Sequence, residues 1–283
     1  MNIRGEPADV GRHCGANEYE VSEAGVAFYS DALDDRDDLY GRLAPPLIFH
    51  SECYAFVGEW YLRNLVGNLH AQQDWELFAP IEVGQKVRTR STIVDRYHKR
   101  GRDYVVNETD ILSARDGSLL VRGRTYQSFL PEGETLREKP SGPRTERPPF
   151  PTAEGRDLRP AELRVDERRC WMFSGPGRNY HTDREEAKKL GFPDIVVQGM
   201  LSTCLVSRVM QQEFGEGWLA GGRMSVKLTA VVWVNERLLC HARVRETVAE
   251  GTRQRTHCDV WVEKEDGTRS LIGTASALEA RRA

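Results

Sequence analysis

The sequence lacks long apolar runs, concentrated positive charge and any recognisable leader segment. No apolar run reaches the roughly 18 to 20 residues that a membrane-spanning helix needs. The first 14 residues are polar and lack the apolar core of a secretory signal, so we expect a cytoplasmic protein. The 40 Lys and Arg residues are balanced by 43 Asp and Glu residues, whereas nucleic-acid binding needs a concentrated positive surface. We therefore expect neither a membrane partner nor a nucleic-acid partner.

The six cysteines show no spacing typical of a redox pair or a metal site. None of them forms a Cys-x-x-Cys pair, and no Cys/His cluster has the spacing of a zinc site. Four lie within apolar segments (Cys53, Cys204, Cys240 and Cys258). We expect buried free thiols in a reducing compartment, with a catalytic cysteine as the lesser alternative and no metal or redox cofactor.

Prolines gather in one part of the 283-residue chain. Seven of the 13 prolines fall in 131–160, a stretch that also carries many charges and few large apolar residues. This composition is typical of an extended linker. We predict an N-terminal domain over 1–130, a linker over 131–160 and a C-terminal domain over 161–283.

The two predicted domains share landmarks at a nearly constant spacing. Val83 and Val234 are 151 residues apart, and the turns Asp116–Gly117 and Asp266–Gly267 are 150 apart. Asp-Gly between alternating apolar runs favours a β-hairpin, so the repeat indicates a duplicated antiparallel meander. The predicted strands are 90–97, 104–112 and 119–129 in the first copy, and 239–248, 256–262 and 270–278 in the second.

Each copy also has one long helical pattern before its strands. Apolar residues recur at helical spacing over 52–66 and over 200–214, and Gly67 and Gly215 follow where a left-handed cap is wanted. A long helix followed by long antiparallel strands predicts a sheet wrapped around the helix. We therefore expect an α+β, tandem double hotdog architecture whose two sheets pair edge to edge, which also removes two open edges.

The segment 173–200 contains the residues most suited to chemistry. Thr182 and Glu185 have the spacing of a capping box, which predicts a short helix starting just after His181. Gly199 stands at the start of the second long helix, where free N–H groups and the helix dipole favour a developing negative charge. A histidine in a nearby loop could move a proton beside that helix end.

These residues resemble a known family motif. Asn179-x-His181-x-Asp183 followed by Gln198–Met200 is similar to the hydratase 2 motif of MaoC-like enzymes, and 69–84 looks like their N-terminal hotdog. The resemblance covers roughly 40–130 and 165–278. It implies His181 as the base, Asn179 as its polar partner and the Gly199 N–H as the thioester-oxygen donor. It also implies substrate contacts from its neighbours (Arg178, Tyr180, Gln198 and Met200).

One family residue is absent. The motif carries an acidic residue before the Asn, but Pro176 or Gly177 occupies that position here, depending on the alignment. Tyr180, Arg178 or a carboxylate from the other half could fill the gap. Asp183 is expected to stabilise the first turn of the short helix.

The resemblance implies hydration or dehydration of the C2–C3 bond of an acyl-CoA. Thioesterase action on the same scaffold and non-catalytic binding of an acyl thioester stay open as alternatives. The first copy lacks Asn-x-His-x-Asp, so we interpret it as the copy that accommodates the acyl group. Within it, His70 is expected to form hydrogen bonds where the halves meet, and His50 aligns near Gln198. Formation of a homodimer is a further possibility.

Overall fold

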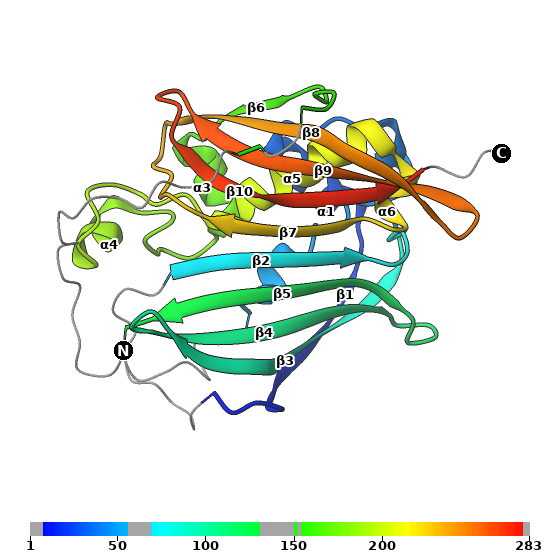
Figure 1. Cartoon of the computed structure of the whole chain (residues 1–283). Coiled ribbons are helices and arrows are strands. Elements are labelled where there is room, and N and C mark those ends of the chain that lie inside the picture. Colours follow the sequence, from blue (N-terminus) through cyan, green and yellow to red (C-terminus); the bar gives the residue numbers. More distant parts are fainter. Residues whose placement is uncertain (1–7, 56–68, 131–149, 152–153, 280–283) are drawn as a thin grey trace.

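The computed structural model describes residues 8–55, 69–130, 150–151 and 154–279. Within these ranges the chain forms a single ten-stranded sheet, and the long helix of the second half packs on one side of it (Figure 1). The strands in the first half are β1 (His13–Glu20), β2 (Leu69–Leu77), β3 (Lys86–Lys99), β4 (Arg102–Ser113) and β5 (Leu119–Phe129). Those in the second half are β6 (Ala161–Arg164), β7 (Arg223–Leu228), β8 (Arg237–Glu250), β9 (Arg253–Lys264) and β10 (Arg269–Leu278).

The order of the strands displays the duplication. It is β1-β3-β4-β5-β2-β7-β10-β9-β8-β6, so the second half repeats the first in mirrored order. Strands β2 and β7 pair antiparallel, with Gln72 opposite Lys227 and Glu76 opposite Arg223. We call this β2–β7 pair the seam. The predicted edge-to-edge joining of two sheets is confirmed.

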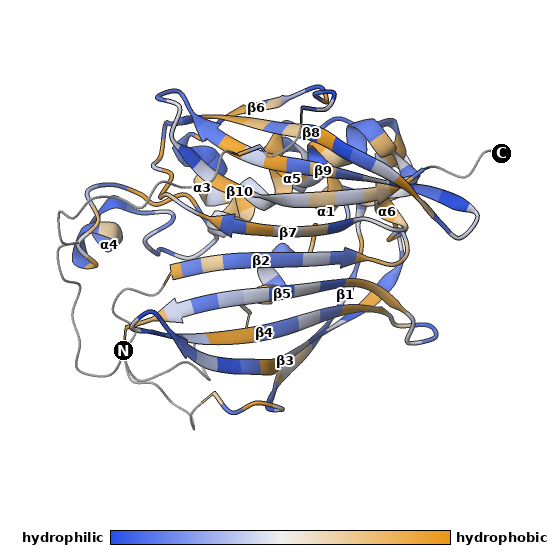
Figure 2. Cartoon of the chain, in the orientation of Figure 1, coloured by the Kyte–Doolittle hydropathy of each residue, from blue (hydrophilic) through white to orange (hydrophobic). Residues whose placement is uncertain are grey.

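The alternation of side chains explains why these segments form strands. Along the start of β3, Val87, Thr89 and Ser91 are buried, whereas the residues between them are exposed. A period of two places alternate side chains on opposite faces of a sheet. Figure 2 shows hydrophilic and hydrophobic residues interspersed along the strands in this manner. The hairpin turns at Gly117 (φ 73°) and Gly267 (φ 77°) adopt the left-handed backbone that Asp-Gly predicts.

The helices are α1 (Glu23–Leu33), α3 (Glu167–Ser174), α4 (Arg184–Lys189), α5 (Gly199–Phe214) and α6 (Glu216–Leu219). Two short 3-10 helices, η1 (Asp38–Gly41) and η2 (His50–Cys53), belong to the first half. The long helix predicted over 200–214 is confirmed by α5. Most of the helix predicted over 52–66 lies outside the described residues, and 52–53 belong to a 3-10 rather than an α-helix.

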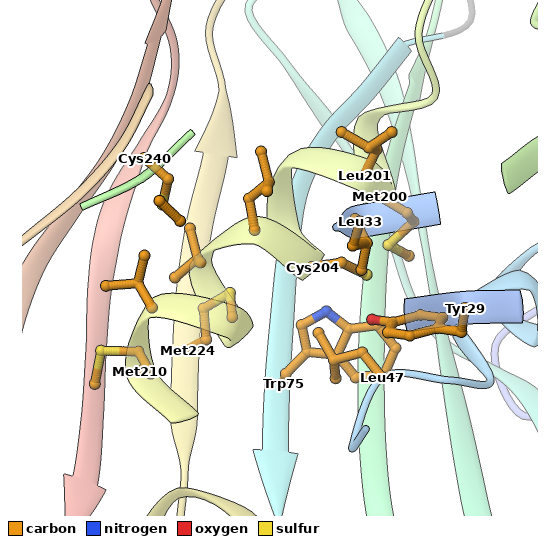
Figure 3. Packing of buried hydrophobic residues seen from close by; sticks show 14 of the residues in the cluster. Tyr29, Leu33, Leu47, Trp75, Met200, Leu201, Cys204, Met210, Met224 and Cys240 are labelled. Atoms are coloured by element: carbon orange, nitrogen blue, oxygen red, sulfur yellow. The ribbon is translucent and has the colours of Figure 1, made fainter. Parts of the chain in front are cut away.

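The hydrophobic core lies between α5 and the sheet and extends without a break into the first half. Figure 3 shows Met200, Leu201 and Cys204 of α5 above Trp75 of the seam strand β2, with Tyr29 and Leu33 of α1 beside them. The two halves thus share one core at the seam. The division of the chain at 130 and 160 stays a prediction, and 131–149 lie outside the described residues.

Candidate functional site

The predicted site begins in the loop between α3 and α4. Helix α4 starts at Arg184, and the Asp183 carboxylate accepts hydrogen bonds from the N–H groups of Glu185 and Glu186. Asp183 is therefore the N-cap, and the expectation of Thr182 in this role was wrong by one residue. The Thr182 hydroxyl instead contacts the loop, accepting from the Asn179 N–H (3.0 Å) and donating to the Gly177 carbonyl (2.9 Å). Asp183 acts as the expected stabiliser of the first helical turn.

Asn179 ties this loop together. Its Oδ1 accepts from the backbone N–H of His181 at 2.8 Å, and its Nδ2 donates to the Ser174 carbonyl at 3.0 Å. The side chain is thus committed to backbone groups on both sides of the loop. It contacts His181 through the main-chain N–H, and its predicted role as the polar partner of the His181 base stays a prediction.

The His181 ring is anchored by a hydrogen bond to the segment that precedes α5. Its Nδ1 lies 2.7 Å from the carbonyl oxygen of Val196, which can only accept, so Nδ1 carries the proton. The neutral ring consequently has its lone pair on Nε2. Burial lowers the pKa of His181 to about 4, although the bond to Val196 opposes the shift. His181 is therefore a neutral imidazole at pH 7 with its basic nitrogen fixed in direction.

Val196 connects this ring to the start of α5. Residue Val196 forms an isolated bridge with Trp233, and the Val197 N–H donates to the Val232 carbonyl at 2.9 Å. The chain then enters α5 at Gly199, with Gln198 as an N-cap whose side chain makes no capping bond. Among the described residues, no acceptor takes the N–H of Gly199 or Met200. The short segment 196–199 thus contains both the carbonyl group that anchors His181 and the first residue of α5.

Gly199 lies close to two side chains of the first and second halves. A Cβ at this position would lie 2.2 Å from Cδ2 of Leu228 and 3.2 Å from Nδ1 of His70. Leu228 ends β7 and His70 lies near the start of β2, so both neighbours belong to the seam. A Cβ at this position would therefore require the Leu228 side chain to move, and the predicted donor role of the Gly199 N–H stays a prediction. Met200 itself is fully buried in the core.

The first half contributes His70, which the sequence singled out, together with two hydrogen-bond partners that it did not place, Tyr54 and Gln73. The Tyr54 hydroxyl lies 2.7 Å from His70 Nδ1, and His70 Nε2 lies 3.1 Å from Gln73 Oε1. Because an amide oxygen only accepts, His70 carries its proton on Nε2 and accepts from Tyr54. Burial lowers the pKa of His70 to about 4.

His70 therefore forms hydrogen bonds within the first half while its ring packs against Gly199 of the second. The expected hydrogen bond across the seam is made instead by Asp74, which accepts from the Ser225 hydroxyl at 2.7 Å. His50 also approaches the second half, because its ring stacks on Phe173 of α3 with centroids 4.0 Å apart. Burial lowers the pKa of His50 to about 4 as well.

Two predicted substrate contacts have other partners in this structure. Arg178 forms an exposed ion pair with Asp183 at 2.9 Å, which holds the pKa of that carboxyl below its ordinary value. Tyr180 lies between His181 and Phe192, with ring centroids 3.9 Å and 5.8 Å away. Burial raises the pKa of Tyr180. Neither side chain is an acid, and the expectation that one of them, or a carboxylate of the other half, fills the gap stays a prediction.

Thiol chemistry receives no support from the cysteines. All six are free thiols, and burial raises the pKa of four of them, Cys53, Cys170, Cys204 and Cys258, to about 12. A thiol rather than a thiolate is a poor nucleophile.

Within the described ranges, no group of three or more His, Cys, Asp or Glu side chains could hold a metal ion. No helix in these ranges is long and apolar enough to cross a membrane.

Two cavities lie away from this loop. One of about 310 Å³ opens over the seam and is lined by residues that include Asp74, Arg223 and His257. The other, of about 760 Å³, lies over α1 and η1 and is lined mainly by polar and acidic side chains such as Asp31 and Asp35. Neither is lined by a predicted site residue. The case for the 196–199 segment therefore rests on its hydrogen-bonding groups.

Known proteins resemble the chain in both sequence and fold. Residues 149–266 match the family model described as the MaoC like domain. A solved structure named MaoC-like dehydratase is 18% identical, with 96% of this chain and 99% of the other covered and a TM-score of 0.75. The MaoC-like dehydratase from Phytophthora capsici is 17% identical, with 96% and 97% covered and a TM-score of 0.69.

A conserved protein from Mycobacterium tuberculosis, described as having a double hotdog fold, is 13% identical, with 95% and 96% covered and a TM-score of 0.65. No curated protein sequence matches the chain. At these identities the structural neighbours establish the fold alone, and the family model records a similarity over 149–266. The chain thus has the double hotdog fold, and its residues 149–266 match the model of the MaoC like domain.

Proposed function

We propose that this protein adds water to, or removes water from, the C2–C3 bond of an acyl-CoA thioester, as a hydro-lyase of the MaoC-like kind. The observation that carries the proposal is the hydrogen bond from His181 Nδ1 to the Val196 carbonyl. This bond ties the neutral His181 ring to the segment that leads into α5 and leaves the lone pair of Nε2 as its basic site. Hydration beside a thioester needs a base for water and donors for the carbonyl oxygen, and the 181–199 region supplies both types of group.

In the hydration direction, Nε2 of His181 takes one proton from water as the water oxygen forms a bond to C3. The π electrons of the C2–C3 bond move toward the thioester carbonyl, whose oxygen gains negative charge. The N–H groups at the start of α5 stabilise that charge. His181 then returns the proton to C2, so one water is added and the histidine ends neutral.

The substrate carries its own coenzyme, so no resident cofactor is part of the proposal. The acyl group would extend toward the seam, where Tyr54 and His70 of the first half lie near Gly199.

We place the protein in the cytoplasm, because its free cysteines suit a reducing compartment. Formation of a homodimer stays a prediction from the sequence.

Thioester hydrolysis is the second candidate, and one observation favours it. Neither position that aligns with the family carboxylate holds an acid, since Pro176 and Gly177 occupy them. Hydrolysis needs a water activated near the carbonyl and depends less on a second proton-transfer group. A non-catalytic acyl-thioester-binding subunit is the third candidate, and the retained His181 geometry argues against it.

A two-channel assay separates the three candidates. Wild-type protein is mixed with a panel of enoyl-CoA thioesters, while enoyl absorbance and free thiol are followed together. The proposal predicts loss of absorbance with no thiol release. Release of thiol would replace the proposal with thioesterase action. Binding of acyl-CoA with no change in either channel would support the non-catalytic alternative.

A further inference from the structure

Gln198 holds a buried hydrogen-bond acceptor that no other described residue satisfies. Its Oε1 has almost no accessible surface and no partner among the described residues. Gln198 precedes α5 with φ −62° and ψ 129°, and its side chain does not cap the helix. A buried amide oxygen without a donor is unfavourable, so such an atom in a native protein calls for an explanation. A donor supplied by a ligand is one such explanation.

The surroundings of Gln198 connect this acceptor with the proposed site. Along 195–198, Ile195 and Val197 are buried, whereas Val196 and Gln198 are partly exposed. This alternation in extended chain places the side chains of Val196 and Gln198 on the same face. The backbone carbonyl of Val196 is the anchor of His181. The next residue, Gly199, contributes the first N–H of α5.

This arrangement is complementary to a 3-hydroxyacyl thioester. Such a ligand has an accepting carbonyl oxygen and a donating hydroxyl group that are separated by one methylene carbon. The start of α5 offers N–H donors to the carbonyl, and Gln198 Oε1 is an acceptor for the hydroxyl. Pro176 and Gly177, at the aligned position of the missing acid, have no side-chain acceptor to offer.

We propose that Gln198 is the residue that recognises the 3-hydroxyl group of the substrate, and that it holds the corresponding water in the hydration direction. One hydrogen of that water would point to His181 Nε2 and the other to Gln198 Oε1. Gln198 would thereby provide the second hydrogen-bond acceptor that an acidic residue could otherwise provide. This inference rests on the proposed function, because it assumes that the acyl thioester lies at the start of α5.

The test measures affinity, so that it does not depend on turnover. In His181→Asn protein the introduced side-chain amide can still donate to the Val196 carbonyl, whereas the basic Nε2 is gone. In this background, Kd is measured for a 3-hydroxyacyl-CoA and for the saturated acyl-CoA of equal length. We expect the hydroxylated ligand to bind about tenfold more tightly, which corresponds to one net hydrogen bond.

Adding Gln198→Met should remove this tenfold preference and leave the affinity for the saturated ligand unchanged. Adding Gln198→Glu keeps an acceptor and should preserve the preference. The matched control is Gln211→Met, at a buried glutamine near the other end of α5 that donates to Asp37. The control should alter stability without altering the preference.

Three results would overturn the inference. They are the absence of any preference before Gln198 is changed, an unchanged preference in Gln198→Met protein, and an equal loss of affinity for both ligands. The last would show that Gln198 contacts the part common to both thioesters. Wild-type protein that fails to hydrate enoyl-CoA while the preference depends on Gln198 would refute only the proposed function.

Discussion

The two halves of the molecule have the same strands in mirrored order, but the described segments between their first two strands differ. In the second half, α3, the His181 loop and α4 lead into α5 at an uncapped glycine. In the first half, η1 and η2 occupy the corresponding stretch, and His50 is buried against Phe173 instead of lying in an open loop. The strand framework was thus retained in both copies, while the groups suited to proton transfer are assembled in one.

The first half keeps a different set of polar groups, and these have structural partners. Glu52 of η2 accepts from Tyr19 at 2.7 Å and from Thr89 at 2.6 Å. Tyr54, His70 and Gln73 form a continuous chain of hydrogen bonds beside the seam. Buried polar groups that satisfy one another stabilise one arrangement of the chain. We infer that the first half contributes a rigid wall to the site and the second contributes the base.

Acid should destabilise both halves through three histidines whose pKa is lowered. Burial lowers the pKa of His50 and His70 in the first half and of His181 in the second to about 4. The unfolded chain binds protons near pH 6.5, whereas the folded chain binds them only near pH 4, so the stabilisation is complete above 6.5 and is lost as the pH falls to 4. Each such histidine accounts for about 3 kcal/mol over this range.

Denaturant unfolding at pH 7 and pH 5 measures this effect. His181→Asn should make the free energy of unfolding less dependent on pH than in wild type, because one of the three groups is removed. His98→Asn is the control, since His98 is exposed and paired with Asp103. An equal pH dependence in wild type and His181→Asn would contradict the burial of a neutral His181.

A smaller effect is expected where the halves meet at Gly199. Gly199→Ala should cost about 1 to 3 kcal/mol of stability, because the added methyl group would lie 2.2 Å from Leu228 and 3.2 Å from His70. It should also lower the rate of hydration by moving the start of α5. Thermal unfolding measures the first effect, and enoyl-CoA consumption measures the second.

Leu228→Ala provides the matched background for this change. In Leu228→Ala protein there is room for the methyl group, so the added cost of Gly199→Ala should fall markedly. Additive costs in the double variant would show that the contact with Leu228 does not require glycine at this position.

Much of the sheet could be predicted because its determinants are local. The alternation of apolar and polar residues and the Asp-Gly turns predicted these strands to within a few residues. The prediction over 119–129 coincides with β5. The cap of α4 was misplaced because Thr182 and Asp183 are adjacent and both are good N-cap residues. The backbone resolves this choice by giving Asp183 the extended conformation that precedes the helix.

The meeting of His70 with Gly199 could not be predicted in the same way. The two residues are 129 positions apart in the chain, and their contact depends on the antiparallel pairing of β2 with β7. The register of such a pairing is set by the packing of both halves and not by either segment alone. The lack of a donor for Gln198 Oε1 among the described residues likewise follows from the three-dimensional positions of its neighbours and not from the local sequence.

The most direct test of the claim that the second half carries the chemistry is a matched pair of variants, His181→Asn and His70→Asn. Each replaces a partly exposed histidine, whose pKa is lowered, with a residue that can keep one of its hydrogen bonds. On the best enoyl-CoA substrate, we predict that His181→Asn lowers kcat/KM for hydration by at least about 100-fold. His70→Asn should lower it by less than about tenfold, through packing alone. Comparable losses in the two variants, or full activity in His181→Asn, would contradict the account.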